Sequence, residues 1–131
     1  MKALTRDEIL GADDLKTESV EVPEWGGTVV VRELTGSERD TWEASVVKTN
    51  GTKVTIDSHN MRAKLAALCI VDDAGERLFT DKEAAKLGAK SAAALDRVTD
   101  VARRLSRIGE DEIESLGKVS SPTKSDASVS T

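Results

Sequence analysis

The stretch from Val20 to Glu43, VEVPEWGGTVVVRELTGSERDTWE, constrains the fold of this chain more than any other segment. Val20 and Val22 alternate with polar residues, which is the period of a half-buried strand. Pro23 ends that strand or confines it to a sheet edge, because proline has no N–H group to donate. A first strand is therefore expected just before Pro23.

The second half of the same stretch predicts a turn, a second strand and a helix. Gly26 and Gly27 are expected to supply the positive φ angles that a tight hairpin loop requires. Residues 28–31 are all β-branched, which suits a pleated strand. Thr35 and Glu38 have the spacing of a capping box, which opens a helix. We therefore expect a β-hairpin that leads directly into a capped helix.

Length and composition limit what such a chain can do. Its 131 residues are enough for one domain, and its aromatic residues are two Trp, one Phe and no Tyr. A core of aliphatic side chains favours helix packing over a deep aromatic ligand pocket. The net charge of −5 argues against nucleic acid as a partner, because phosphate binding relies on clustered Lys and Arg. We interpret the basic cluster Arg103-Arg104 and Arg107 as a solvated helix face.

The sequence also indicates a compartment. Cys69 is the single cysteine, which excludes an internal disulfide and fits a reducing environment. The N-terminus lacks the apolar run of a signal peptide, and no stretch approaches the roughly 18 apolar residues of a membrane span. We expect a soluble intracellular protein that has no membrane partner.

Hydrophobic periodicity predicts an α+β fold, in which an N-terminal β-hairpin is followed by a mostly helical domain and a disordered C-terminal tail. A single domain is expected over residues 1–116, with the tail over 117–131. The hairpin is predicted at about 17–33, and helices at about 37–48, 58–70, 81–88, 91–108 and 110–116. A helical turn is also expected from Asp7 to Leu10, ended by Gly11.

One or two residues set the expected ends of several helices and strands. Asn50-Gly51 is a strong turn signal and is expected to stop the first helix. Residues 53–56 fit either a brief third strand or an extended arm. Asp57 or Ser58 is expected to cap the second helix. Gly109 stands where a C-terminal helix cap is expected, after the helix of 91–108.

Residues 70–83 predict a short hairpin followed by a capped helix. Asp72 to Gly75 form the expected turn between two very short strands, and Thr80 with Glu83 repeats the capping-box spacing. The turn resembles a calcium loop, but counting back from Gly75 places Ile70 at the first ligand position. We therefore interpret it as a hairpin turn.

No residue pattern indicates catalysis. His59 is the single histidine and is expected at the surface or as a helix cap. Cys69 shares an apolar helix face with Leu65 and Leu68, so a core position is expected rather than a nucleophile. Glu38 is accounted for by its capping role. The sequence predicts no catalytic, cofactor-binding or metal-binding residue, and therefore no enzyme.

What remains is surface for a protein partner. The helix of 91–108 carries a wide apolar stripe, which either packs entirely on the helix of 58–70 or leaves part for a partner, in the helix-in-groove manner. The candidate partner-binding residues are Trp42, Val46, Leu95, Val98, Val101, Leu105 and Ile108.

Two motifs resemble the tail assembly chaperones of long, non-contractile-tailed bacteriophages and related prophages. The first is V-R-E-L-T-G-x-E-R-D, present at residues 31–40. The second is V-x-D-x-G-x-R-L-F-x-D-x-E, present at residues 71–83. The helix ending RRLSRIG, followed by an acidic segment, is also similar. The resemblance covers roughly residues 10 to 116.

This resemblance implies a binding protein with no cofactor. Such chaperones bind the long helical tape measure protein and recruit tail tube subunits, then leave before the virion is complete. The implied location is the cytoplasm of the host bacterium, and self-association is a further expectation. The family commonly makes a longer form by ribosomal frameshifting, and Gly117-Lys118 is a dipeptide that a slippery sequence would encode.

Two other functions remain open at this point. One is a virion structural protein, such as a head–tail connector or tail terminator, which would be present in finished particles. The other is a small regulatory adaptor of the host, which would bind neither tail protein.

Overall fold

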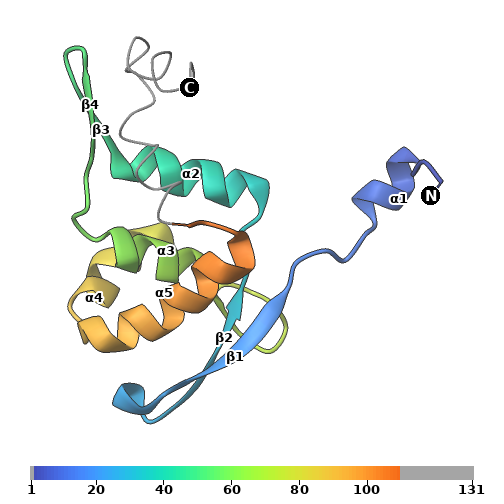
Figure 1. Cartoon of the computed structure of the whole chain (residues 1–131). Helices are drawn as coiled ribbons and strands as arrows, with labels where there is room; N and C mark the ends of the chain where they lie inside the picture. Colours follow the sequence, from blue (N-terminus) through green and yellow to red (C-terminus); the bar gives the residue numbers. More distant parts are fainter. Residues whose placement is uncertain (1, 110–131) are drawn as a thin grey trace, which may run out of the picture.

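The structure is a computed structural model that describes residues 2–109, and it confirms the α+β fold with an N-terminal hairpin and a mostly helical remainder (Figure 1). Its helices are α1 (Arg6–Leu10), α2 (Gly36–Val46), α3 (Met61–Cys69), α4 (Ala84–Gly88) and α5 (Ala92–Ser106). Its strands are β1 (Thr17–Val22), β2 (Gly27–Arg32), β3 (Val47–Asn50), β4 (Lys53–Ile56) and β5 (Ile70–Val71). The predicted helix of 110–116, the predicted tail and Gly117-Lys118 lie outside the described residues.

The predicted N-terminal hairpin is confirmed, and a third strand joins it. β1 and β2 pair antiparallel, with a 3-10 turn at Pro23–Trp25 between them. Gly26 alone has a positive φ, of 76°, so the expectation of two such glycines was wrong. β5 pairs antiparallel with β2, which places β2 at the centre of a three-stranded sheet. The short hairpin predicted after α3 is also present, as an antiparallel bridge between Val71 and Arg77, but the pairing of β5 with β2 was not predicted.

α2 begins as predicted but ends earlier than predicted. Thr35 and Glu38 form both hydrogen bonds of the capping box. The helix ends at Val46 rather than near residue 48, because residues 47–50 pair with Lys53–Ile56 as a second hairpin. The predicted turn residue Gly51, at φ 66°, belongs to the tip of this hairpin and does not stop the helix. Of the two readings of residues 53–56, the strand is therefore correct.

The start of α3 differs from the expected cap. Neither Asp57 nor Ser58 is the N-cap; that position is Asn60, which has a φ of 58° and no capping hydrogen bond from its side chain. Asp57 Oδ1 instead accepts a hydrogen bond from the backbone N–H of His59, at 3.1 Å. This local bond stabilises a turn, so the helix starts at Met61.

α4 and α5 begin after the N-terminal caps that the sequence predicts. Thr80 and Glu83 form the second capping box, at a 3-10 turn that leads into α4. The hydroxyl of Ser91 accepts a hydrogen bond from the N–H of Ala94 and caps α5. At the C-terminal end, Arg107 rather than Gly109 takes the left-handed conformation, with a φ of 58°.

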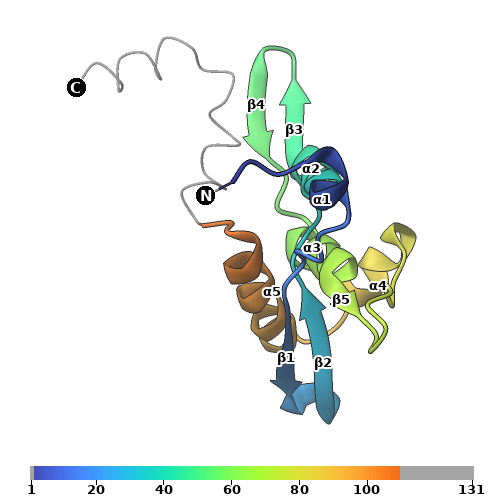
Figure 2. The same ribbon diagram turned by 90° about the vertical axis from the view of Figure 1, so that its right-hand side faces the viewer.

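The core lies between the helices and the sheet. Six of the nine residues of α3 are buried, and the helix packs against α2, α4 and α5, while α5 also covers β1 and β2. The β3–β4 hairpin and α1 both project from this body (Figures 1 and 2). α1 is capped by Thr5 and Glu8 and ends at Gly11, which confirms the predicted helical turn and adds a capping box.

Candidate partner-binding surface

The described residues were predicted to hold neither a catalytic nor a metal-binding group, and the structure bears on the metal ligands. Within residues 2–109, no group of three His, Cys, Asp or Glu side chains could hold a metal ion. Cys69 is fully buried, and burial raises the pKa of its thiol to about 12. Asp72 Oδ1 accepts hydrogen bonds from the N–H groups of Ala74 and Glu76, as expected for a tight turn. No helix in the described range is long and apolar enough to cross a bilayer.

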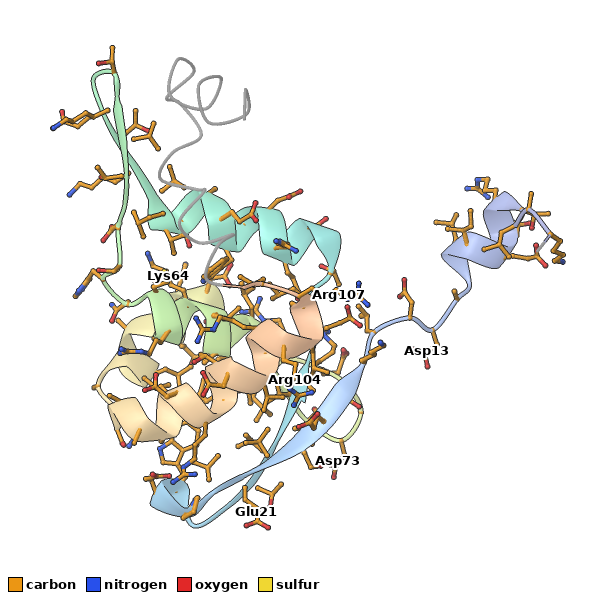
Figure 3. The ribbon with its side chains drawn as sticks, viewed as in Figure 1. Asp13, Glu21, Lys64, Asp73, Arg104 and Arg107 are labelled. Atoms are coloured by element: carbon orange, nitrogen blue, oxygen red, sulfur yellow. The ribbon has the colours of Figure 1, made fainter. Side chains whose placement is uncertain are left out.

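Most of the predicted partner-binding side chains pack inside the domain. The buried ones are Trp42, Val46, Leu95, Val98 and Ile108, while Val101 and Leu105 are partly buried. The apolar stripe of α5 is divided between two neighbours, because α5 packs on α3 and on the β1–β2 hairpin. Arg104 marks the sheet-facing side, where it pairs with Glu18 of β1 at 2.7 Å (Figure 3).

Two of these buried side chains nevertheless line hollows at the surface between α3 and α5. One hollow, of about 310 Å³, has Trp42, Met61 and Leu65 among its lining residues. A second, also about 310 Å³, includes Met61 and Leu95. Because the two hollows share Met61 and Arg62, they adjoin. We call this surface the α3–α5 groove, defined by Trp42, Met61, Arg62, Leu65, Leu95, Asp96, Asp100 and Arg103.

The rim of the α3–α5 groove is charged but balanced. Arg62 pairs with Asp96 at 2.8 Å, which links α3 to α5, and Arg103 pairs with Asp100 at 3.1 Å. Arg62 and Asp96 are 58% and 52% exposed, and exposed pairs of this kind are weak. Little binding free energy would therefore be lost if these side chains gave up their pairs for contacts with a bound protein. Trp42, Leu65 and Leu95 are almost fully buried, so Met61 supplies most of the apolar surface that is accessible inside this polar rim.

Trp42 is almost fully buried beneath this groove, at 1% exposed. Its indole Nε1–H donates a hydrogen bond to the carbonyl oxygen of Met61, at 3.3 Å. The same indole lines a further hollow of about 270 Å³, on the side of Lys64 and Leu68. Lys64, labelled in Figure 3, donates to the carbonyl oxygen of Ser45 and joins α3 to α2.

The first sequence motif has a structural role. Arg32 pairs with Glu38 at 2.6 Å, the N–H of Leu34 donates to Ser106 Oγ at 2.9 Å, and Arg39 donates to the carbonyl oxygen of Ser106 at 3.3 Å. These contacts connect the end of β2, the start of α2 and the end of α5. The motif therefore positions the helices that border the groove.

The second motif is mostly structural too, with one exception. Arg77 donates from Nε and Nη2 to the carbonyl oxygen of Ala67, near the end of α3, and also pairs with Asp81. Phe79 packs against the core. Leu78, between them, is 52% exposed and was not singled out from the sequence. A lone apolar residue in a turn gives no periodic signal that could have identified it.

The sequence analysis also missed three exposed apolar residues at the N-terminus. Leu4, Ile9 and Leu10 are 62%, 56% and 68% exposed. Leu4 precedes the capping residue Thr5, and Ile9 is the fourth helical residue, which is the arrangement of a hydrophobic staple. That spacing is visible in the sequence and could have identified them.

The comparisons with known proteins agree with this architecture. The family model described as phage tail assembly chaperone matches residues 7–118. Among solved structures, the bacteriophage HK97 tail assembly chaperone is similar, with a TM-score of 0.55 and 20% sequence identity. The likeness covers 79% of this chain and 95% of the HK97 chain, and at that identity it shows the shared fold. No curated protein matches this sequence. Because the family model spans most of the chain, the chain belongs to the phage tail assembly chaperone family.

Proposed function

We propose that this chaperone binds the tape measure protein of its phage and helps to recruit tail tube subunits, without catalysis. The family match over residues 7–118 is the observation that supports this most strongly. A tape measure protein exposes long apolar helical surface that would aggregate alone. A small domain whose groove exposes Met61 inside a charged rim can cover part of such a surface reversibly.

The α3–α5 groove is the surface we propose for that contact. Trp42 and Leu95, two of the residues predicted from the sequence, line it together with Met61 and Leu65. Val46, Val98 and Ile108 support the groove from the core. Val101 and Leu105, which are partly buried, border the sheet-facing side of α5 and are proposed as secondary contacts.

The finer features of the function are also proposals. The chaperone would act in the cytoplasm of the host bacterium, associate with further copies of itself, and be absent from the mature virion. A longer form would arise by frameshifting at Gly117-Lys118. Its test is the coding sequence, because a Gly-Lys spelling other than GGA-AAA or GGA-AAG removes this slip site.

Co-expression with the tape measure protein from the same phage genome tests the groove. The wild-type chain is expected to keep tape measure protein soluble and to co-purify with it. The double variant Arg62→Glu/Asp100→Arg reverses two exposed rim charges and is expected to reduce co-purification about tenfold, the change that ~1.4 kcal/mol produces. The control Asp73→Arg changes an exposed residue at the turn after β5 (Figure 3) and should bind as wild type. If the double variant bound tape measure protein as well as the Asp73→Arg control does, the contact would lie outside the α3–α5 groove.

The composition of purified virions separates a chaperone from a connector or tail terminator. A chaperone is expected to be missing from finished particles, whereas a connector would be present at the copy number of a ring. Detection at ring stoichiometry, together with tape measure protein that stays insoluble, would overturn the proposed function.

A further inference from the structure

The N-terminal arm, residues 2–14, carries apolar side chains that are not buried against the rest of residues 2–109. Every one of these residues is exposed, and α1 contributes no buried residue. Figure 1 shows α1 apart from the body. A five-residue helix is far below the length that is stable alone in water. Here it is nevertheless capped at its N-terminus and carries Leu4, Ile9 and Leu10 at its surface.

A hollow with apolar and basic lining residues, which complements the apolar and acidic side chains of the arm, lies elsewhere on the domain. It has a volume of about 450 Å³, and Trp25, Phe79 and Leu87 form its apolar lining, with Lys86 and Lys90 beside them. We call this hollow the arm pocket; Glu24 completes its lining. Glu24 is paired with Arg97 at 2.9 Å, while neither lysine forms an ion pair with another residue in 2–109.

The charges of the arm and of the arm pocket are complementary. Between Leu4 and Asp14 the arm carries four carboxylates, on Asp7, Glu8, Asp13 and Asp14, against the single cation of Arg6. Its ion pairs, Arg6 with Asp7 and Lys2 with Glu8, are exposed and therefore weak. An acidic segment with apolar side chains suits an apolar hollow flanked by Lys86 and Lys90.

In the structure the arm lies apart from the arm pocket of its own chain, because it joins β1 at Thr17 whereas the pocket lies beyond Val22. Lys16 is fixed to Glu33 by two hydrogen bonds of 2.8 Å, so the free linker is limited to residues 11–15. The five linker residues span at most about 18 Å and the five-residue helix adds about 7 Å, so an arm folded back along β1 would reach the pocket only when nearly fully extended. The arm pocket lies at the opposite end of β1, about 20 Å away at ~3.3 Å per residue. Figure 3 shows Asp13 in this linker, directed away from the body.

We propose that the arm of one copy docks in the arm pocket of a second copy, with Leu4, Ile9 and Leu10 against Trp25, Phe79 and Leu87. This contact joins two different surfaces and is therefore head-to-tail, so it repeats from copy to copy. It deepens one part of the proposed function, self-association, by naming the two surfaces that meet, and it requires no other tail protein.

Molar mass measured by light scattering, with the full-length chain alone, tests the proposal. The wild type is expected to form assemblies larger than a monomer as concentration rises from micromolar to millimolar. Ile9→Asp/Leu10→Asp is expected to weaken self-association about a hundredfold, because two apolar side chains lose their burial. Lys86→Glu/Lys90→Glu should also weaken it, while the exposed controls Ala12→Asp and Lys82→Glu should not.

Mixing the two defective variants identifies the partner surface. The arm-defective variant keeps an intact pocket, and the pocket-defective variant keeps an intact arm, so together they should form a complex that stops at two chains. A wild type that remains monomeric, an arm variant that assembles normally, or a mixture that stays monomeric would each overturn the proposal. None of these results depends on tape measure binding, so the proposed function is tested separately.

Discussion

Nη2 of Arg32 donates to both carboxylate oxygens of Glu38, at 2.6 Å each, across the junction between β2 and α2. The two side chains are 13% and 18% exposed. Glu38 also accepts a hydrogen bond from the N–H of Thr35 and completes the capping box of α2. One carboxylate thus holds the strand end and the first helical turn together.

Replacing that carboxylate should destabilise the domain more than a surface charge would. Glu38→Ala is expected to lower the free energy of unfolding by about 2–4 kcal/mol, because it leaves a largely buried guanidinium unpaired and removes a cap. Urea denaturation followed by circular dichroism measures this. The matched control is Glu43→Ala, whose pair with Arg39 is about one-third exposed and is worth less than about 1 kcal/mol. Equal losses would contradict this role.

Ser106 should contribute through one hydrogen bond to a distant element. Its Oγ accepts from the N–H of Leu34, a buried residue, at 2.9 Å. Ser106→Ala leaves that donor unsatisfied and is expected to cost about 1–2 kcal/mol of unfolding free energy. Ser37→Ala, at an exposed position of α2, is the control and should be nearly neutral. Thermal or urea unfolding of the two variants distinguishes them, and identical stabilities would disprove the contribution.

Cys69 should resist thiol reagents in the folded protein. Burial, with a smaller effect from the charge of Glu38, raises the pKa of its thiol from 9.0 to about 12. The folded state therefore keeps the proton, and this contribution to stability is complete below pH 9 and is lost as pH rises towards 12. Iodoacetamide labelling at neutral pH, read by mass spectrometry, should occur only after urea is added. Rapid labelling without urea would show that the thiol is accessible.

The β3–β4 hairpin should open more readily than the β1–β2 hairpin. β3 and β4 pair only with each other, and none of their side chains is fully buried. Figures 1 and 2 show them projecting from the body. A two-stranded hairpin alone is marginally stable, and such elements open locally. Amide hydrogen exchange should therefore be much faster in β3–β4, whereas similar protection of both hairpins would contradict this.

Local signals predicted local structure well, and long-range packing much less well. The capping boxes at Thr35 and Thr80 and the cap at Ser91 were confirmed, because each depends on residues three apart. The local hairpin of β5 was predicted and is present as the bridge between Val71 and Arg77. Its pairing with β2 was missed, because Val71 and Val30 lie about forty residues apart in the sequence.

The candidate site was harder to predict for the same reason. Apolar residues at helical spacing, such as Leu95 and Val98, indicate a buried face without showing what buries it. In the structure, α3 and the strands β1 and β2 bury most of that face of α5. The groove at Trp42 forms only when α2, α3 and α5 pack together, so no sequence pattern could have outlined it.

The fluorescence of Trp42 is the most direct test of the central claim, that the α3–α5 groove binds tape measure protein. The chain has two tryptophans, Trp25 in the arm pocket and Trp42 in the groove, so Trp25→Phe leaves Trp42 as the single reporter. Titration of this variant with tape measure protein from the same phage, corrected for that protein's own emission, is expected to give a saturable change in Trp42 emission. Arg62→Glu/Asp100→Arg in the same background should weaken it. A complex that forms without changing Trp42 emission, or no complex at all, would contradict the account.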